Sequence, residues 1–171
     1  MRAPFQVLVI PFRRIGNGRY EFAVFRRSDG EYWQFIAGGG EDRETPLQAA
    51  KREANEEAGI ALDAEYVPLD STSTVPVAGV TGEYTWGQDV FVIPERAFGV
   101  QVGDGTLVLS TEHTEYAWVR CEGAFSMLEW DSNRNALWEL NERLKREEHS
   151  EPGNAGDCVQ PPAPRPSVRD A

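Results

Sequence analysis

The stretch GGGEDRETPLQAAKREANEEAGI, residues 38–60, decides how this chain folds. It concentrates acidic residues in a protein whose formal net charge is already -11. The carboxylates of Glu53, Glu56 and Glu57 fall within little more than one helical turn, where like charges disfavour a helix. Such a departure from a local rule is typical of a functional site. The six acidic residues of the stretch are Glu41, Asp42, Glu44, Glu53, Glu56 and Glu57.

The residues around these acids predict a helix over residues 46–58. Thr45 fits the N-cap position, and Gln48 completes a capping box three residues later. Pro46 fits the first helical position, where its missing N–H leaves nothing unsatisfied. Gly59 fits the left-handed residue that commonly ends a helix.

At 100° per residue, the three clustered carboxylates share one arc of this helix and an apolar stripe occupies another. We expect the stripe to face the core and the acids to face away from it. A solvated acidic face, with Arg52 as a surface partner, is the simplest explanation, but it leaves Gly38–Gly40 unexplained. A site for a hard cation such as Mg²⁺ uses carboxylate oxygens and bridges to phosphates. The apolar stripe consists of Leu47, Ala50, Ala54 and Ala58.

The spacing of the stretch resembles the Nudix box at every fixed position. Gly38 is followed after five residues by Glu44, and after seven more by REANEEAGI, residues 52–60. Only Ala54 departs mildly, since the family usually has a larger aliphatic residue there. The resemblance implies the Nudix α/β/α sandwich with a mixed central β-sheet, an α/β fold. It also implies hydrolysis, dependent on Mg²⁺ or Mn²⁺, of a nucleoside diphosphate linked to another group.

The roles of the acids follow from this resemblance. Glu53 and Glu57 would bind metal on the helix, and Glu56 would be either a further ligand or the base that activates water. Glu112, in TEHTEYAW, matches a distant carboxylate that completes the metal site, although it could also be an ordinary loop acid. Arg52 would hold the acids in place through a fork-like ion pair. The predicted catalytic residues are Glu56, Arg52 and Glu53, and the predicted metal ligands are Glu53, Glu56, Glu57 and Glu112.

Three further features refine this assignment. Glu44 would orient the loop before the helix, and the glycines Gly38–Gly40 would let the backbone approach metal or phosphates closely. His113 is expected to be a structural, hydrogen-bonding histidine rather than a catalyst.

Weaker likeness extends over residues 2–146, in the segments RRSDGEYWQFIAGG, TEHTEYAWV and WDSNRNALWEL. These resemble the Nudix branch that contains dihydroneopterin triphosphate diphosphatase, also described as a dATP pyrophosphohydrolase. Arg2, Arg26 and Arg27 are candidate phosphate contacts, since arginine binds phosphate bidentately. Arg26 is the preferred one, because it matches a binding position of that branch. Surface charge at strand ends is the alternative explanation for all three.

The ring of a substrate would need flat and polar contacts. Trp33 and Trp86 could stack on a base or a pterin, although tryptophan is more often a core residue. Ala37 stands where the pterin branch has a threonine lining the substrate, which weakens that assignment. Ser132 and Asn133 would close the far end of the pocket. The predicted substrate-binding residues are therefore Arg2, Arg26, Ala37, Gly38, Trp33 and Ser132.

The rest of the chain predicts one domain, residues 1–149, followed by a tail. Strands are expected over residues 5–12, 20–27, 31–40, 65–69, 72–77 and 89–93, with one or two more within 106–121. The spacing of Leu137, Leu140 and Leu144 predicts an amphipathic helix over residues 130–148, capped by Asp131 or Ser132. Residues 150–171 hold five of the eleven prolines and read as a disordered tail, in which PPAPRP could also be a proline-rich ligand.

Amino-acid composition limits the classes of partner and the cellular location that we expect for this protein. The acidic balance argues against nucleic-acid binding, which needs basic surface. No apolar run approaches the ~20 residues that span a membrane, and the N-terminal run, interrupted by Gln6 and Pro11, reads as a strand rather than a signal peptide. Cys121 and Cys158 match no metal-ligand spacing and favour a reducing, cytoplasmic location. The sequence does not predict the oligomeric state.

The Nudix resemblance implies a Mg²⁺-dependent pyrophosphohydrolase whose partner is a small phosphorylated molecule. Its substrate would be dihydroneopterin triphosphate or another nucleoside triphosphate, cleaved to the monophosphate and pyrophosphate. The enzymatic alternative is a dinucleoside polyphosphate hydrolase of the diadenosine tetraphosphate type. A non-catalytic nucleotide-sensing module is the alternative from another class, but such a module would be expected to lack the box carboxylates, which this chain keeps.

Overall fold

The computed structural model describes residues 1–16, 18–80 and 82–150 of the chain. The predicted tail lies outside these residues, apart from Ser150. None of the described helices is long and apolar enough to cross a membrane. In chain order the elements are β1 (Arg2–Arg14), β2 (Tyr20–Arg27), β3 (Trp33–Gln34), β4 (Ile36–Glu41), α1 (Pro46–Ala58), β5 (Tyr66–Pro76), η1 (Val77–Gly79), β6 (Val92–Gln101), β7 (His113–Val119), α2 (Cys121–Met127) and α3 (Asp131–Ser150).

Strand β1 organises the sheet because both of its edges are paired. Along one edge β6 runs parallel to it, from the pair Gln6 and Glu95 onward. The other edge is divided between β4 and β2, which pair antiparallel with its first and last parts. Strand β5 extends the sheet beyond β6, while β3 and β7 pair with β2. The sheet is therefore mixed, as expected for the α/β fold.

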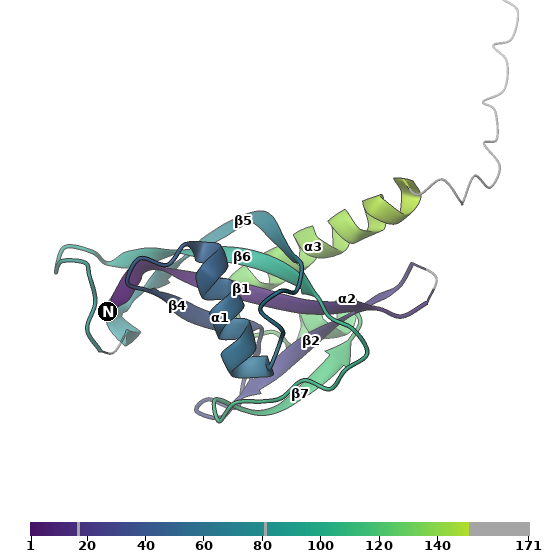
Figure 1. The fold of residues 1–171 in the computed structure, drawn as a ribbon, viewed down its shortest axis with the longest axis horizontal. Helices are drawn as coiled ribbons and strands as arrows, with labels where there is room; N and C mark the ends of the chain where they lie inside the picture. Colours follow the sequence, from purple (N-terminus) through teal and green to yellow (C-terminus); the bar gives the residue numbers. More distant parts are fainter. Residues whose placement is uncertain (17, 81, 151–171) are drawn as a thin grey trace, which may run out of the picture.

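Alternation of side chains along β1 divides the interior into two cores. Val7 and Val9 point towards α1, whereas Leu8 and Ile10 point towards α2 and α3. Figure 1 shows α1 across the near face of the sheet, while α3 starts behind the sheet and projects beyond its edge. The expected α/β/α sandwich is thus confirmed.

Helix α1 begins and ends where its sequence predicts. Its N-cap Thr45 accepts a hydrogen bond from the Gln48 backbone N–H at 3.3 Å, and the Gln48 side chain accepts one from the Thr45 N–H at 2.8 Å. Gly59 ends the helix at φ 67°, a left-handed conformation that suits glycine. These caps depend only on neighbouring residues, which explains why local sequence predicts them well.

The buried face of α1 differs from the predicted stripe. Leu47 is 41% exposed, whereas Ala49 is buried. Glu57 is also buried, at 3% exposure, so the acids do not lie on a face separate from the core. The small alanines allow the helix to pack closely on the sheet, and its buried arc extends to the carboxylates.

Strand β6 is the main element that the sequence analysis missed. Its prediction stopped at Ile93, because Pro94 and Gly99 interrupt a strand pattern. In the structure Gly99 makes room for α3, since a Cβ atom there would lie 2.8 Å from Leu140. The two pieces predicted over residues 65–69 and 72–77 form one strand, β5 (Tyr66–Pro76), β7 begins only at His113, and the short helix α2 was not predicted.

The C-terminal helix is confirmed as α3. Leu137, Leu140 and Leu144 are buried against the sheet, as their spacing predicts. Asp131 is the first residue of the helix and lies in its first turn, where an acid suits the helix dipole.

Candidate active site

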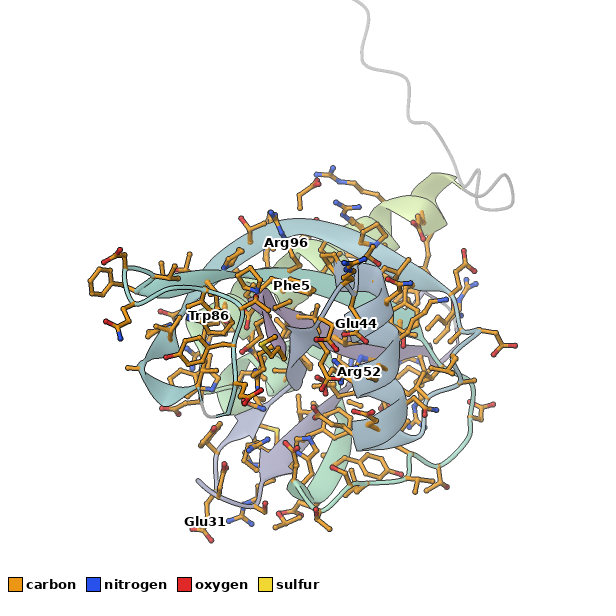
Figure 2. The ribbon with its side chains drawn as sticks, turned by 60° about the vertical axis from the view of Figure 1, so that its left-hand side comes forward. Phe5, Glu31, Glu44, Arg52, Trp86 and Arg96 are labelled. Atoms are coloured by element: carbon orange, nitrogen blue, oxygen red, sulfur yellow. The ribbon has the colours of Figure 1, made fainter. Side chains whose placement is uncertain are left out.

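Arg52 is the hub of the acidic cluster on α1. Its Nε and Nη2 donate to the two carboxylate oxygens of Glu44 at 2.9 and 3.0 Å. Its Nη1 donates to Glu53 at 2.9 Å and to Glu56 at 3.1 Å, and its Nη2 also reaches the Gly39 carbonyl at 2.9 Å. Figure 2 shows Arg52 and Glu44 next to one another at α1. One guanidinium thus connects the loop before α1, strand β4 and two acids of α1. This is the fork-like role predicted for Arg52.

Gly38 creates the space in which Glu53 lies. A Cβ atom on Gly38 would be 2.0 Å from the Glu53 carboxylate carbon, closer than any real contact. Gly38 does not adopt a left-handed conformation, so its value lies in the missing side chain rather than in backbone freedom. The Glu53 carboxylate, which is half-buried, can therefore occupy this position only because residue 38 is a glycine.

Glu57 is held by His113, which comes from β7. His113 Nε2 and Glu57 Oε2 are 2.6 Å apart, and both side chains are almost fully buried. The ring of His113 packs against Phe25, with centroids 5.2 Å apart. His113 is therefore the hydrogen-bonding histidine that the sequence predicts, and it positions Glu57.

The electrostatics of these acids suit a cation. Burial raises the pKa of Glu53 to about 7 against the opposing effect of Arg52, and the charges of Glu57 and Glu56 raise it further. Burial also raises the pKa of Glu57, against the opposing hydrogen bond from His113. Ionised carboxylates are therefore unfavourable here without more positive charge than Arg52 supplies. A bound Mg²⁺ would supply that charge, and as a hard cation it prefers carboxylate oxygens as ligands.

Glu112 is paired with Arg27, and its charge contributes to raising the pKa of Glu57. The Arg27 Nη1 donates to Glu112 at 2.6 Å, and the same guanidinium binds Asp29 at 2.7 Å. In the parts of the chain that the structure describes, no three Asp, Glu, His or Cys side chains are arranged to hold a metal ion. Three of the four predicted ligands are instead paired with arginine: Glu112 with Arg27, and Glu53 and Glu56 with Arg52. The four predicted metal ligands thus remain a prediction.

The predicted phosphate contacts differ in their surroundings. Arg2 lies over Gly39, where an added Cβ atom would be 2.3 Å from its Nη2, and its buried Nε has no hydrogen-bond partner among the described residues. Arg26 pairs with Glu115 at 2.9 Å and with Glu31 at 3.6 Å. Because the Nε of Arg2 has no hydrogen-bond partner among the described residues, Arg2 is better placed than Arg26 to bind a phosphate.

The predicted stacking residues lie apart from the acids. Trp33 is half-buried and packs against the core on the α3 side of the sheet. Trp86 stacks on Tyr84 with centroids 4.7 Å apart, and Figure 2 shows it well away from Arg52.

A pocket of about 400 Å³ opens on the α3 side of the sheet. Three residues that the sequence analysis named, Ala37, Ser132 and Asn133, line it. Because neighbouring side chains of a strand point to opposite faces, Ala37 faces this pocket while Gly38 faces the acids. The lining residues that the sequence analysis missed include Gln6, Tyr32, Gln34, Glu95 and Trp130.

The sequence contains a pattern that could have identified one of these lining residues, Glu95. Ile93, Glu95 and Ala97 alternate in β6, and all three are buried on the α3 side. A charged residue at an inward position of a strand indicates a functional role. The signal becomes visible only once β6 is recognised as a strand.

We expect the change Arg52→Lys to destabilise the protein by about 1–3 kcal/mol, because lysine cannot reproduce the fork to Glu44 or the other contacts. Urea unfolding followed by tryptophan fluorescence measures the loss. Arg19→Lys, at an exposed position, is the matched control. An Arg52→Lys variant as stable as the control would show that these ion pairs do not hold the loop to the helix.

Comparisons with known proteins agree with this geometry. The family model described as NUDIX domain matches residues 6–139. Dihydroneopterin triphosphate diphosphatase of Escherichia coli (strain K12) is 28% identical over 138 residues, which cover 80% of this chain and 91% of the relative. The structure of a candidate NUDIX hydrolase from Listeria monocytogenes is 43% identical with a TM-score of 0.76, covering 85% of this chain and 97% of the other.

A more distant solved structure shares the fold alone. The binary complex of a C. elegans Ap4A hydrolase is 20% identical with a TM-score of 0.64, covering 82% of this chain and 96% of that one. The family model, by contrast, spans most of the 171 residues, including the whole of α1. This chain therefore belongs to the NUDIX domain family, and it is a hydrolase that acts on phosphoric anhydride bonds.

Proposed function

We propose that this enzyme is a Mg²⁺-dependent pyrophosphohydrolase that cleaves a nucleoside triphosphate-like substrate to its monophosphate and pyrophosphate. The observation that carries the proposal is the pair of carboxylates on Glu53, which is half-buried, and Glu57, which is buried, beside a strand whose opposite face lines a pocket. Such carboxylates are costly to keep unless a cation and a polyanionic substrate use them.

The metal would be held by carboxylates of α1. Glu53, Glu56 and Glu57 would supply oxygen ligands, and Glu112 would join them on release from Arg27. A bound divalent ion of this kind neutralises phosphate charge and lowers the pKa of a coordinated water. Manganese would serve in its place.

The protein residues would position the substrate and accept a proton. Glu56 is the most exposed of the three helix acids, with 58% of its side chain accessible, and Arg52 fixes one of its oxygens. It is therefore the acid best placed to take a proton from an attacking water. Glu57, which is buried, and Glu53, which is half-buried, would stay in place.

A substrate would extend around strand β4. Among the described strands, β4 pairs with β1 alone, so its other edge is available. The ring would occupy the pocket beside Ala37 on the α3 side, while the phosphates would pass Gly39 and Arg2 towards the acids. Gly38 and Gly39 let the side chains of Glu53 and Arg2 lie directly against this strand.

The change Gly39→Ala should raise KM about tenfold with a smaller effect on kcat, because the new methyl group displaces the Arg2 guanidinium. Steady-state kinetics of pyrophosphate release measures both constants. In an Arg2→Ala background the same change should add no further loss, since the two substitutions remove one interaction. Additive losses would place the function of Arg2 elsewhere.

The named relatives support the proposal in different degrees. The similar E. coli protein is a dihydroneopterin triphosphate diphosphatase, which favours that substrate or a related triphosphate. The C. elegans neighbour, an Ap4A hydrolase, keeps dinucleoside polyphosphate hydrolysis as the second candidate. The half-exposed Trp130 at the pocket supports that candidate, since a second base could stack there.

A product analysis tests the proposal. The purified enzyme is incubated with Mg²⁺ and, in parallel, with dihydroneopterin triphosphate, each dNTP and Ap4A, and the products are separated by ion-exchange chromatography. Monophosphate and pyrophosphate from a triphosphate support the proposal. ATP and AMP from Ap4A, without triphosphate turnover, would favour the second candidate. Binding without turnover of any compound would favour a sensing module.

We also propose a cytoplasmic location and a single domain over residues 1–149. The location rests on the cysteines: Cys121, the described one, is a free thiol. The domain boundary rests on α3, which contacts β5 and β6 and closes the second core.

A further inference from the structure

The pocket on the α3 side contains a buried carboxylate that the proposed hydrolysis does not use. Glu95 lines the pocket and is only 5% exposed. It lies on the opposite face of the sheet from the acids of α1, because β6 residues 93, 95 and 97 point towards α3. A metal site on α1 therefore does not account for it.

The partners of Glu95 are neutral. Gln6 Nε2 donates to its Oε2 at 3.0 Å across the β1–β6 pair, and the Ser132 side chain gives a second hydrogen bond. Among the described residues that line the pocket there is no Lys, Arg or His. Burial raises the pKa of Glu95, and the hydrogen bonds from Ser132 and Gln6 oppose this only in part.

A carboxylate offers about four acceptor positions, so two neutral donors leave acceptor capacity unused. Buried polar groups normally have at least one hydrogen-bond partner, and Glu95 has two. The remaining capacity of Glu95 is therefore suited to donors that arrive with a ligand.

The rest of the pocket suits a flat, polar ring. Tyr32 and Trp130 meet edge to face, with ring centroids 5.5 Å apart, and provide aromatic surface. Gln34 and Asn133 add buried amide groups, at 8% and 3% exposure. The Asn133 carbonyl oxygen is fixed by the Phe35 N–H at 2.8 Å. A volume of about 400 Å³ is within the usual range for small-molecule sites.

We propose that Glu95 is the specificity-determining residue of this enzyme, and that it selects rings in which an amide N–H lies next to an exocyclic amino group. This is the 2-amino-4-oxo edge shared by guanine and pterins. The inference rests on the proposed function, since it specifies the substrate class of the same site. Two neighbouring N–H donors can bind one carboxylate together, whereas adenine presents a ring nitrogen lone pair beside its amino group and would be repelled.

The competing explanation is that Glu95 only ties β1 to β6 and α3 through Gln6 and Ser132. A structural tie would affect all substrates equally. A recognition role would change the ratio between substrates, and this difference makes the two explanations separable.

The first test uses the wild-type enzyme and compares kcat/KM for dihydroneopterin triphosphate, dGTP, dITP and dATP. We expect kcat/KM for dihydroneopterin triphosphate and for dGTP to exceed that for dATP by about 10–100-fold. The value for dITP, which lacks the amino group, should lie between that for dGTP and that for dATP. The ratio of the pterin to dGTP identifies which source of this edge the pocket prefers. Equal turnover of all four would overturn the inference without the need for any variant.

The second test uses Glu95→Gln, in which an amide nitrogen replaces one acceptor oxygen. We expect kcat/KM for dGTP to fall about 10–100-fold and that for dATP to be retained or to rise, because an amide matches the donor–acceptor pair of adenine. The matched control is Glu139→Gln, at a carboxylate of α3 that accepts a hydrogen bond from the Ser71 hydroxyl in β5 and does not line this pocket. An equal fall for all substrates in Glu95→Gln would show a structural role instead.

A binding measurement separates this inference from the proposed function. Isothermal titration with the non-hydrolysable methylene-bridged analogues of dGTP and dATP measures binding without turnover. Since both analogues carry the same triphosphate, the difference between their affinities reports the contribution of the ring pocket. Selective binding of the guanine analogue without hydrolysis of any triphosphate would refute the proposed function and support the role of Glu95. Hydrolysis of triphosphates with equal binding of both analogues would do the opposite.

Discussion

Replacing Glu57 by glutamine should lower Mg²⁺-dependent kcat by about 10²–10⁴-fold while the protein stays folded. Glutamine has the same shape and can still accept the hydrogen bond from His113 Nε2, so the packing of α1 on β7 is preserved. It removes the negative charge that a metal ion would need. Because burial raises the pKa of Glu57 and so opposes its ionised form, the variant should be at least as thermostable as the wild type at neutral pH.

Turnover is measured by pyrophosphate release at saturating Mg²⁺, and folding by the thermal midpoint in circular dichroism. Glu122→Gln, in the first turn of α2 and exposed, is the control for loss of a carboxylate elsewhere. A loss of activity combined with an unchanged or higher midpoint would assign Glu57 to function. Retained Mg²⁺-dependent turnover in Glu57→Gln would sink the assignment of the α1 acids as metal ligands.

The second large effect on kcat is expected when a single methyl group is added at Gly38. In Gly38→Ala the new Cβ atom would lie 2.0 Å from the Glu53 carboxylate, so this side chain must move away. Its neighbour Arg52, which bonds Glu53 at 2.9 Å, would move with it. Since a displacement of about 1 Å can cost 10²-fold in rate, we expect kcat to fall by about two orders of magnitude.

The thermal midpoint of this variant should change little, because the end of a flexible side chain yields rather than the backbone. Gly123→Ala is the matched control, since its Cβ atom would meet Val119 at an ordinary 3.5 Å in α2. Wild-type kcat in Gly38→Ala would contradict the steric role of Gly38. A large fall in midpoint would instead reveal that the site cannot relax around the methyl group.

Local sequence was sufficient for the elements whose ends are set by their neighbours. Helix α1 was predicted to the residue because Thr45, Pro46, Gln48 and Gly59 act within a few positions of one another. The leucine spacing of α3 was sufficient for the same reason. Only the start of strand β6 was predicted, because Gly99 makes sense only beside Leu140, which lies far away in the chain.

The features of the candidate site likewise fall into those that local sequence predicts and those that depend on distant residues. Which acids share the helix follows from their spacing, and the Nudix resemblance assigns them a chemistry. Their burial does not follow from spacing: Glu57 is enclosed because His113 arrives from β7, and Leu47 is exposed although it belongs to the apolar stripe. Arg27 likewise holds Glu112, 85 residues away, through the pairing of β2 with the segment before β7.

By itself the sequence determined the family, the α/β class, helix α1 and the identity of its acids, because all of these depend on residue type and short-range spacing. Only the tertiary structure decided which carboxylates are buried, which arginine holds each of them, and that Glu95 meets Gln6 at the floor of a pocket. These contacts join strands that are neighbours in the sheet but distant in the chain. Their pairing is set by the packing of the whole sheet, and no local pattern encodes it.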